Sequence, residues 1–211
     1  MDNPKPKTPR RGRPPRSQKA IDASRERIVA AARDLFAAEG YDGVSMRKIA
    51  ARAGCLPATL YTLFPGKRQL LHCLWGQIFS DLNTALARSC QESAPHDGLL
   101  RLCFAHIDFW LDRPQDYRAI FLVEDRLQDS GDPYFVESEV AARYLDILHG
   151  AIVQAQASGE IGAGNPDEVR KVLLCCIQGL TYNLIAIPEF DWGDIQRLKT
   201  LTITTILLGL R

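Results

Sequence analysis

The sequence contains no apolar run long enough to cross a membrane, and its basic N-terminus lacks the apolar segment of a secretory signal. Its six cysteines form no CxxC pair and accompany no histidine pattern typical of zinc. These absences favour a cytoplasmic protein whose thiols are mostly small buried side chains in a reducing compartment. A thiol sensor at Cys55, or at the adjacent Cys175 and Cys176, stays open as an alternative, as do disulfide bonds.

Sequence patterns of catalysis are missing as well. We find no P-loop, no metal-ligand spacing and no order of Ser, His and Asp that fits a catalytic triad. The glycine-rich segment Gly159–Gly164 follows no expected strand, so it does not indicate a phosphate-binding loop. His106 and Asp108 do not make a metal site by themselves. We therefore expect no enzyme activity, no metal and no cofactor.

No segment of useful length alternates with a period of two, so no sheet is expected, and no internal repeat is visible. The 211 residues, 46% hydrophobic and 24% charged, are typical of a soluble globular protein of one or two domains. The expected fold class is all-α. Helices are expected at about 22–39 (beginning at Asp22 or Ser24), 46–53, 57–64, 67–89, 97–112, 115–127, 134–157, 167–186 and 193–209, with a polar turn at 128–133.

Charge is distributed unevenly along the chain. Residues 1–76 carry 15 Lys and Arg against 6 Asp and Glu, a formal charge of +9, whereas residues 77–211 carry 11 against 19, a charge of −8. This asymmetry indicates that the first part of the chain meets a polyanion and that the second part does not. The first 76 residues are therefore the expected functional unit.

The most informative stretch is residues 45–67, SMRKIAARAGCLPATLYTLFPGK. Ser45 is placed to cap a short helix, Gly54 stands where a helix exit favours a left-handed residue, and Pro57 suits the first turn of a second helix. The inward side chains of that second helix are expected to be Leu60, Leu63 and Phe64, and the outward ones Thr59, Tyr61 and Thr62. Two helices joined by a tight turn form the helix-turn-helix pattern, whose second helix enters the DNA major groove. An ordinary helical hairpin is the alternative, and the basic surroundings favour DNA.

Residues 1–20 are rich in proline and basic residues and nearly free of apolar ones, so they cannot form a packed core and are expected to be disordered in isolation. They contain Arg11-Gly12-Arg13-Pro14, which resembles the core of an AT-hook, an extended segment whose arginines enter the narrow minor groove of A·T-rich DNA. A basic tail that only improves solubility is the alternative. Adjacency to a helix-turn-helix favours an arm that contacts DNA through Arg11 and Arg13.

The first 85 residues resemble the TetR/AcrR family of bacterial transcription regulators. The resemblance rests on IVAAARDLFAAEGYDGVSM, RKIAARAG and ATLYTLFPGKRQLL; over residues 86–211 only helical content, length and order of elements agree. It implies a homodimer in the bacterial cytoplasm, whose helical C-terminal domain dimerises and binds an effector that releases the operator. The expected domains are a basic arm at 1–20, a helix-turn-helix DNA-binding domain at 21–85 with its recognition helix at about 57–64, and the effector-binding and dimerisation domain at 86–211.

The resemblance also implies roles for single residues. Phosphate contacts are implied for Ser45, Tyr61 and Lys67, and a phosphate or a base edge for Arg47. The exposed face of the recognition helix is expected to present Pro57, Ala58, Thr59 and Thr62.

One departure from the family concerns the start of the recognition helix. Leu56 and Pro57 stand where members often have a Ser or Thr cap and then a Lys or Arg. Base readout would then depend on Thr59, Thr62 and Arg47, and on contact of Ala58 or Pro57 with thymine methyl groups. The basic arm and backbone contacts would supply a large share of the affinity.

The C-terminal part carries aromatic and polar side chains on three expected helices. If these helices surround a cavity, the cavity would suit a hydrophobic or aromatic ligand; a packed core without a cavity is the alternative. The expected lining residues are His106, Trp110, Phe121, Gln178 and Tyr182. The last two helices are the expected dimer interface, because the final one carries an apolar and threonine-rich stripe, and two such helices from each subunit would pack as a four-helix interface.

These observations predict a sequence-specific transcriptional regulator, a repressor released from a palindromic double-stranded operator by a small hydrophobic or aromatic effector. The alternative is an architectural, nucleoid-associated DNA-binding protein without a ligand. The two differ in specificity, since a regulator binds its site roughly 10³-fold or more tightly than other DNA.

Overall fold

The computed structural model describes residues 17–91, 97–123 and 134–210, and all regular elements within these ranges are helices. The all-α prediction is therefore confirmed. The elements are α1 (Gln18–Glu39), α2 (Met46–Arg52), α3 (Pro57–Leu63), α4 (Lys67–Gln91), α5 (Gly98–Leu111), α6 (Pro114–Phe121), the short 3₁₀ helix η1 (Phe135–Glu137), α7 (Glu139–Ala157), α8 (Pro166–Ala186) and α9 (Ile195–Gly209).

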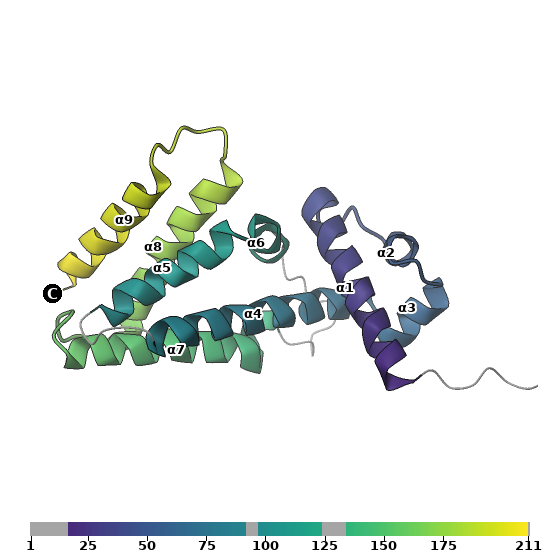
Figure 1. The fold of residues 1–211 in the computed structure, drawn as a ribbon, viewed down its shortest axis with the longest axis horizontal. Helices are drawn as coiled ribbons and strands as arrows, with labels where there is room; N and C mark the ends of the chain where they lie inside the picture. Colours follow the sequence, from purple (N-terminus) through teal and green to yellow (C-terminus); the bar gives the residue numbers. More distant parts are fainter. Residues whose placement is uncertain (1–16, 92–96, 124–133, 211) are drawn as a thin grey trace, which may run out of the picture.

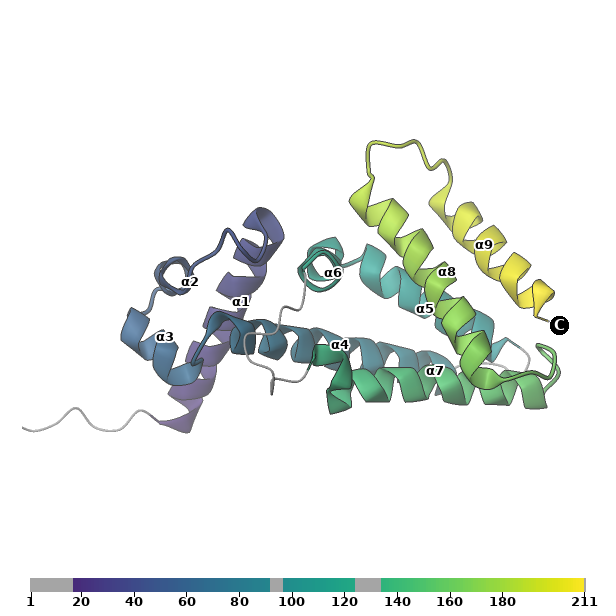
Figure 2. The same ribbon diagram turned by 180° about the vertical axis from the view of Figure 1, so that it is seen from behind.

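The first three helices form a small unit at one end of the molecule, and α4 runs from this unit along the length of the larger helical domain (Figure 1). In the larger domain α7 lies beside α4, α5 packs against α4 and α8, and α9 packs against α5 and α8 (Figure 2). The short helix α6 lies between α5 and α1 and contacts both. Two helices, α4 and α6, therefore connect the small unit with the large one.

Local sequence explains the helix-turn-helix. The Ser45 hydroxyl accepts a hydrogen bond from the Lys48 amide at 3.2 Å, which satisfies one of the free N–H groups at the start of α2. Gly54, after α2, has a φ of 65°, and Gly40, after α1, a φ of 71°. These left-handed conformations favour glycine, so both residues are suited to end a helix, as the sequence predicts for Gly54.

The hydrophobic core is continuous between the two units because α4 contributes to both. Leu70, Leu71 and Leu74 are buried near the small unit, and Leu82 and Leu86 further along are buried within the large domain. Between them, the indole N–H of Trp75 donates to the Ala119 carbonyl of α6 at 2.7 Å. The position of α4 is therefore set by packing at both of its ends.

The structure corrects the predicted starts of two helices. Helix α1 begins at Gln18 rather than at Asp22 or Ser24, because the Ser17 side chain caps it by accepting from the Ala20 amide. Residues 18–20, expected within the basic arm, are thus part of α1. Residues 1–16, with Arg11 and Arg13, lie outside the described residues. In the other case, the helix expected at 134–157 begins only at Glu139, where Ser138 caps it.

Two expectations in the large domain are tested only in part. The helix expected at 115–127 is present as α6, which ends at Phe121. Residues 124–127 and the turn expected at 128–133 lie outside the described residues.

Candidate DNA-binding surface and cavity

Helix α3 is oriented as its sequence predicts. Leu60 and Phe64 are buried and anchor the helix, whereas the Tyr61 side chain is 50% exposed. Pro57, Ala58 and Thr62 are also exposed, and Thr59 is half-buried. The outer face of α3 is therefore available to a partner along its whole length.

The hydroxyl group of Thr62, on the outer face of α3, already makes one hydrogen bond within its own helix. Thr62 Oγ1 donates to the Ala58 carbonyl at 2.8 Å. The hydroxyl oxygen keeps lone pairs that accept hydrogen bonds, and the methyl group stays apolar. Thr62 is therefore suited to accept from a base amino group or to contact a thymine methyl.

Leu56 is the most exposed large apolar residue of the described chain, at 72%. It occupies the N-cap of α3 and makes no side-chain capping hydrogen bond, which confirms the predicted loss of the cap. With Pro57 and Ala58 it forms an apolar tip at the start of the recognition helix. The sequence indicated Leu56 only as a missing cap and not as a contact residue.

The basic residues of α2 differ in their engagement. Lys48 forms an ion pair with Glu39, and Arg52 lies 3.6 Å from Asp34. Arg47 is exposed and has no ion-pair partner within the described part of the chain. Arg47 is thus the α2 cation with the fewest competing contacts.

Lys67, at the start of α4, holds the turn between α1 and α2. Its ammonium group donates to the carbonyls of Tyr41 and Val44, at 2.7 and 3.0 Å, and lies 4.0 Å from the centre of the Tyr41 ring. An ammonium group has three N–H donors, so one is left for a further acceptor. The sequence indicated a phosphate contact for Lys67 and did not reveal this structural role.

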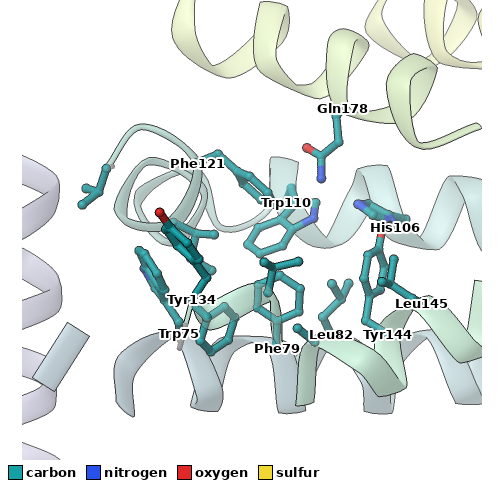
Figure 3. A pocket seen from close by; sticks show the side chains of 15 residues that line it. Trp75, Phe79, Leu82, His106, Trp110, Phe121, Tyr134, Tyr144, Leu145 and Gln178 are labelled. Atoms are coloured by element: carbon teal, nitrogen blue, oxygen red, sulfur yellow. Dashed lines mark hydrogen bonds between the residues drawn. The ribbon is translucent and has the colours of Figure 1, made fainter. Parts of the chain in front are cut away.

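A cavity of about 310 Å³ that opens to the surface lies in the large domain, lined by side chains of α4, α5, α6, η1, α7 and α8 (Figure 3). Its lining consists of Trp75, Phe79, Leu82, His106, Trp110, Ile120, Phe121, Val123, Tyr134, Phe135, Val136, Ala141, Tyr144, Leu145 and Gln178. The cavity is at the lower end of the size range of small-molecule sites and resembles them in being apolar with few polar groups.

Four of the five predicted lining residues border this cavity, namely His106, Trp110, Phe121 and Gln178. Tyr182 does not border it: its side chain is 45% exposed on α8, whereas its neighbours Leu180 and Thr181 are buried. The prediction missed the side chains of α4, such as Phe79, and of α7, such as Tyr144. The helical spacing of these apolar residues is visible in the sequence. Such spacing does not distinguish residues that border a cavity from residues that fill a packed core.

The polar groups of the cavity are few and neutral. The Tyr144 hydroxyl lies 3.2 Å from Nδ1 of His106, and the Tyr117 hydroxyl donates to the Gln178 side-chain oxygen at 3.1 Å. Burial lowers the pKa of His106 to about 3 and raises the pKa of Tyr117 to about 12. All of these groups are therefore uncharged near neutral pH.

Contacts of α6 link this cavity with the DNA-binding unit. Arg33 of α1 lies 3.1 Å from the Asp116 carboxylate of α6 as an ion pair, and Arg113 lies 3.2 Å from Asp81 of α4. Asp116 is buried, and burial raises the pKa of its carboxyl group although Arg33 and Arg113 oppose the shift. Its neighbours on α6, Ile120 and Phe121, line the cavity.

No group of three or more His, Cys, Asp or Glu side chains that could hold a metal occurs among the described residues. All six cysteines are unpaired thiols, and burial raises the pKa of Cys103 to about 12, so this thiol stays protonated.

A helix-turn-helix with an exposed recognition helix, joined by one continuous helix to an all-helical domain with an apolar cavity, defines a class of DNA-binding regulator. Residues 28–74 match the model of a protein family described as bacterial regulatory proteins of the tetR family. The helix-turn-helix unit is therefore that of the tetR family, and the match supports a TetR-family DNA-binding transcriptional regulator. No curated protein matches the sequence.

Solved structures share the fold along nearly the whole chain. A protein of unknown function from Rhodococcus sp. RHA1 is 24% identical, with a TM-score of 0.73 over 89% of this chain and 95% of its own. A putative tetR family transcription regulator from Shewanella sp. PV-4 is 23% identical, with a TM-score of 0.67 over 89% and 97%. FadR from Bacillus subtilis, solved in complex with stearoyl-CoA, is 20% identical, with a TM-score of 0.74 over 88% and 99%. At these identities the likeness establishes the fold alone.

Proposed function

We propose that this protein is a homodimeric repressor that binds a palindromic operator through α3 of each subunit and leaves it when a small apolar or aromatic effector occupies the cavity. The observation that carries the proposal is the course of α4. Its first turn holds the base of the helix-turn-helix through Lys67, and its middle lines the cavity through Trp75, Phe79 and Leu82. A ligand that moves the cavity wall therefore moves a helix on which the DNA-binding unit rests.

We assign the dimer interface to α8 and α9. Several large apolar side chains on these helices are exposed in the single chain, namely Val172, Tyr182, Ile195, Leu201 and Leu208. Among the described residues, α8 is also the one helix whose length and mean hydropathy of 1.2 would suit a membrane span, with a third of that window buried. Length and composition alone are weak evidence for a membrane, and burial of this surface by a second copy of the chain accounts for the same features.

Contacts with DNA divide into two groups. Ser45, Arg47, Tyr61 and Lys67 are proposed to bind phosphates, and Arg47 to reach a base edge as well. Thr59 and Thr62 are proposed to read bases, with Pro57 and Ala58, now joined by the exposed Leu56, contacting thymine methyl groups. The arm would add contacts of Arg11 and Arg13 in the minor groove.

The nature of the effector follows from the lining. Apolar and aromatic side chains dominate, so an apolar molecule gains most from transfer into the cavity. The binding of stearoyl-CoA by the Bacillus subtilis FadR is a property of that protein, and it supports our proposal only in that this fold accommodates a ligand with an apolar chain.

Release of a labelled operator tests the proposal. The operator is first obtained by selecting bound DNA from a random pool, and its affinity is then measured by fluorescence anisotropy against a panel of small apolar and aromatic compounds. Ala141 lines the cavity and is buried, whereas Ala142 beside it is exposed. We expect at least one compound to weaken operator binding by tenfold or more, which corresponds to about 1.4 kcal/mol of coupling.

Ala141→Phe narrows the cavity and should bind the operator while losing this response. The matched variant Ala142→Phe should respond like the wild-type protein. Equal responses of both variants would show that the compound acts elsewhere, and a panel without any effect would contradict the proposed ligand control.

A further inference from the structure

Two nitrogen atoms in the cavity wall are buried without a hydrogen-bond partner, Nε1 of Trp110 and Nε2 of His106. The two side chains are 0% and 1% exposed, and their ring centres lie 6.4 Å apart. An indole N–H can only donate. A buried donor without an acceptor is unfavourable, and the described side chains supply no acceptor at this position.

The hydrogen bond between Tyr144 and His106 sets the character of the second nitrogen. The ring of His106 is neutral near physiological pH, because burial lowers its pKa to about 3. When the Tyr144 hydroxyl donates to Nδ1, the single ring proton resides on Nε2. His106 then presents a second N–H donor beside that of Trp110.

Gln178 supplies a third donor from the opposite wall. Its side-chain oxygen accepts from the Tyr117 hydroxyl at 3.1 Å, which turns the amide nitrogen the other way. In Figure 3 the nitrogen ends of Gln178, Trp110 and His106 are directed toward the same part of the cavity. They come from two helices, α8 and α5, so one atom between them would connect both.

The charge of the lining restricts the ligand further. The lining contains no Lys, Arg, Asp or Glu among the described residues. An ionised carboxylate buried here would have no counter-charge, and burial of an unpaired charge is strongly unfavourable. The acceptor that fits is a neutral oxygen.

We propose that the effector is an uncharged, mainly apolar molecule with a carbonyl oxygen, as in a ketone, an ester or a lactone, and that this oxygen accepts hydrogen bonds from Trp110, His106 and Gln178. This inference rests on the proposed function, because it assigns the chemistry of the ligand to the same cavity.

Three probes with one skeleton test the assignment on the full-length protein. 2-Acetylnaphthalene carries the carbonyl, 2-isopropylnaphthalene replaces the oxygen by a methyl group, and 2-naphthoate replaces the methyl by a charged oxygen. Affinities are measured by isothermal titration calorimetry at pH 8, where the acid is ionised. We expect the ketone to bind at least about tenfold more tightly than the hydrocarbon, since only the ketone satisfies the buried donors, and the carboxylate to bind least.

Two variants link that preference to the named nitrogens. Trp110→Phe removes one donor, and Gln178→Met removes another at similar length, while the Tyr117 hydroxyl keeps the backbone carbonyl of residue 178 at 3.4 Å as an acceptor. Each variant should reduce the preference for ketone over hydrocarbon by about fivefold. Val153→Met, a change at an exposed position of α7 away from the lining, should leave the preference unchanged.

The carbonyl stretching frequency of bound 2-acetylnaphthalene gives an independent readout that does not depend on how well Trp110→Phe folds. It should be lowered in the wild-type protein and return toward its value in an apolar solvent in Gln178→Met. Equal affinities for ketone and hydrocarbon, an unshifted carbonyl frequency or tighter binding of the carboxylate would overturn the assignment. If none of the probes binds while operator binding is intact, the failure lies with the proposed cavity and not with the carbonyl.

Discussion

The guanidinium group of Arg33 in α1 lies 3.1 Å from the carboxylate of Asp116 in α6. One partner belongs to the DNA-binding unit, and the other to a helix whose next turn lines the cavity. Burial raises the pKa of the Asp116 carboxyl group, so its ionised form is held at this position at a cost in stability. Asp116 lowers stability and yet joins the DNA-binding unit to the large domain. We therefore infer that its role is to hold these two units in their relative positions.

Asp116→Asn separates these two effects. The pKa of Asp116 is raised in the folded protein, so the folded state binds more protons than the unfolded state between the ordinary and the raised pKa, and stability falls as the pH rises through that window. Asparagine is neutral, so Asp116→Asn does not lose this stability as the pH rises. We therefore expect this variant to melt at pH 7 at the same temperature as the wild-type protein or higher. The effect of the effector on operator affinity should be at least fivefold smaller than in the wild-type protein. Asp112→Asn, at an exposed position before α6, is the control. An unaltered effector response in Asp116→Asn would show that the ion pair with Arg33 plays no part in coupling effector binding to operator binding.

The lowered pKa of His106 predicts a dependence of stability on pH that is opposite in sign to that from Asp116. Its pKa in the folded protein is lowered to about 3, so below the ordinary pKa of 6.5 the unfolded state binds the extra proton. The free energy of unfolding should therefore fall as the pH falls below about 6.5, by up to about 1.4 kcal/mol per pH unit from this residue. His106→Gln should lack this part of the slope in urea titrations between pH 4 and 7. Identical slopes for the two proteins would mean that His106 is not buried as a neutral ring.

Tyr61 and Thr62 should affect DNA binding in different ways. The exposed Tyr61 is proposed to bind a phosphate, so Tyr61→Phe should weaken all DNA sequences alike, by about fivefold. Thr62→Ala should instead change the base preferred at particular positions, which comparison of selected sequences reveals. An unchanged preferred sequence would refute the assignment of Thr62 to base readout.

The basic arm should be visible in the salt dependence of binding. Deletion of residues 1–16 removes Arg11 and Arg13 and should weaken operator binding while lowering the slope of log K against log salt by about 0.9 for each lost phosphate contact. Titrations at several salt concentrations measure this slope. A truncated protein with the slope of the full chain would show that the arm does not touch DNA.

The exposed stripe of α9 should be required for dimers. Leu201 is 53% exposed, and Leu201→Glu would bury a charge in the proposed interface. We expect the variant to sediment as a monomer in analytical ultracentrifugation and to lose operator binding. Val153→Glu alters a comparably exposed residue of α7, 43% exposed, and should leave the dimer intact. A dimeric Leu201→Glu protein would place the interface elsewhere.

Features governed by neighbours in sequence could be predicted. The cap at Ser45, the left-handed Gly54 and the burial of Leu60 and Phe64 follow from backbone geometry and helical period, and each is present. The start of α1 was missed because the capping residue Ser17 belongs to a segment whose composition suggested disorder.

Features governed by distant residues could not be predicted in the same way. The two carbonyls bound by Lys67 and the carboxylate beside Arg33 are brought to these cations only by the folded chain. Tyr182 shows the same limit within a single helix. The sequence predicted this aromatic side chain at the cavity, but in the structure it is 45% exposed, while its neighbour Thr181 is buried. The unpaired nitrogen of Trp110 likewise becomes visible only when all its neighbours are known.

The most direct test of the account is selection of DNA from a random pool by the purified full-length protein at physiological salt. The account predicts one enriched palindromic or pseudo-palindromic sequence, with half-sites about one helical turn or a small multiple apart, bound roughly 10³-fold or more tightly than unrelated DNA. Absence of an enriched sequence, or enrichment of A·T-rich DNA alone, would contradict it and indicate an architectural DNA-binding protein whose basic arm dominates binding.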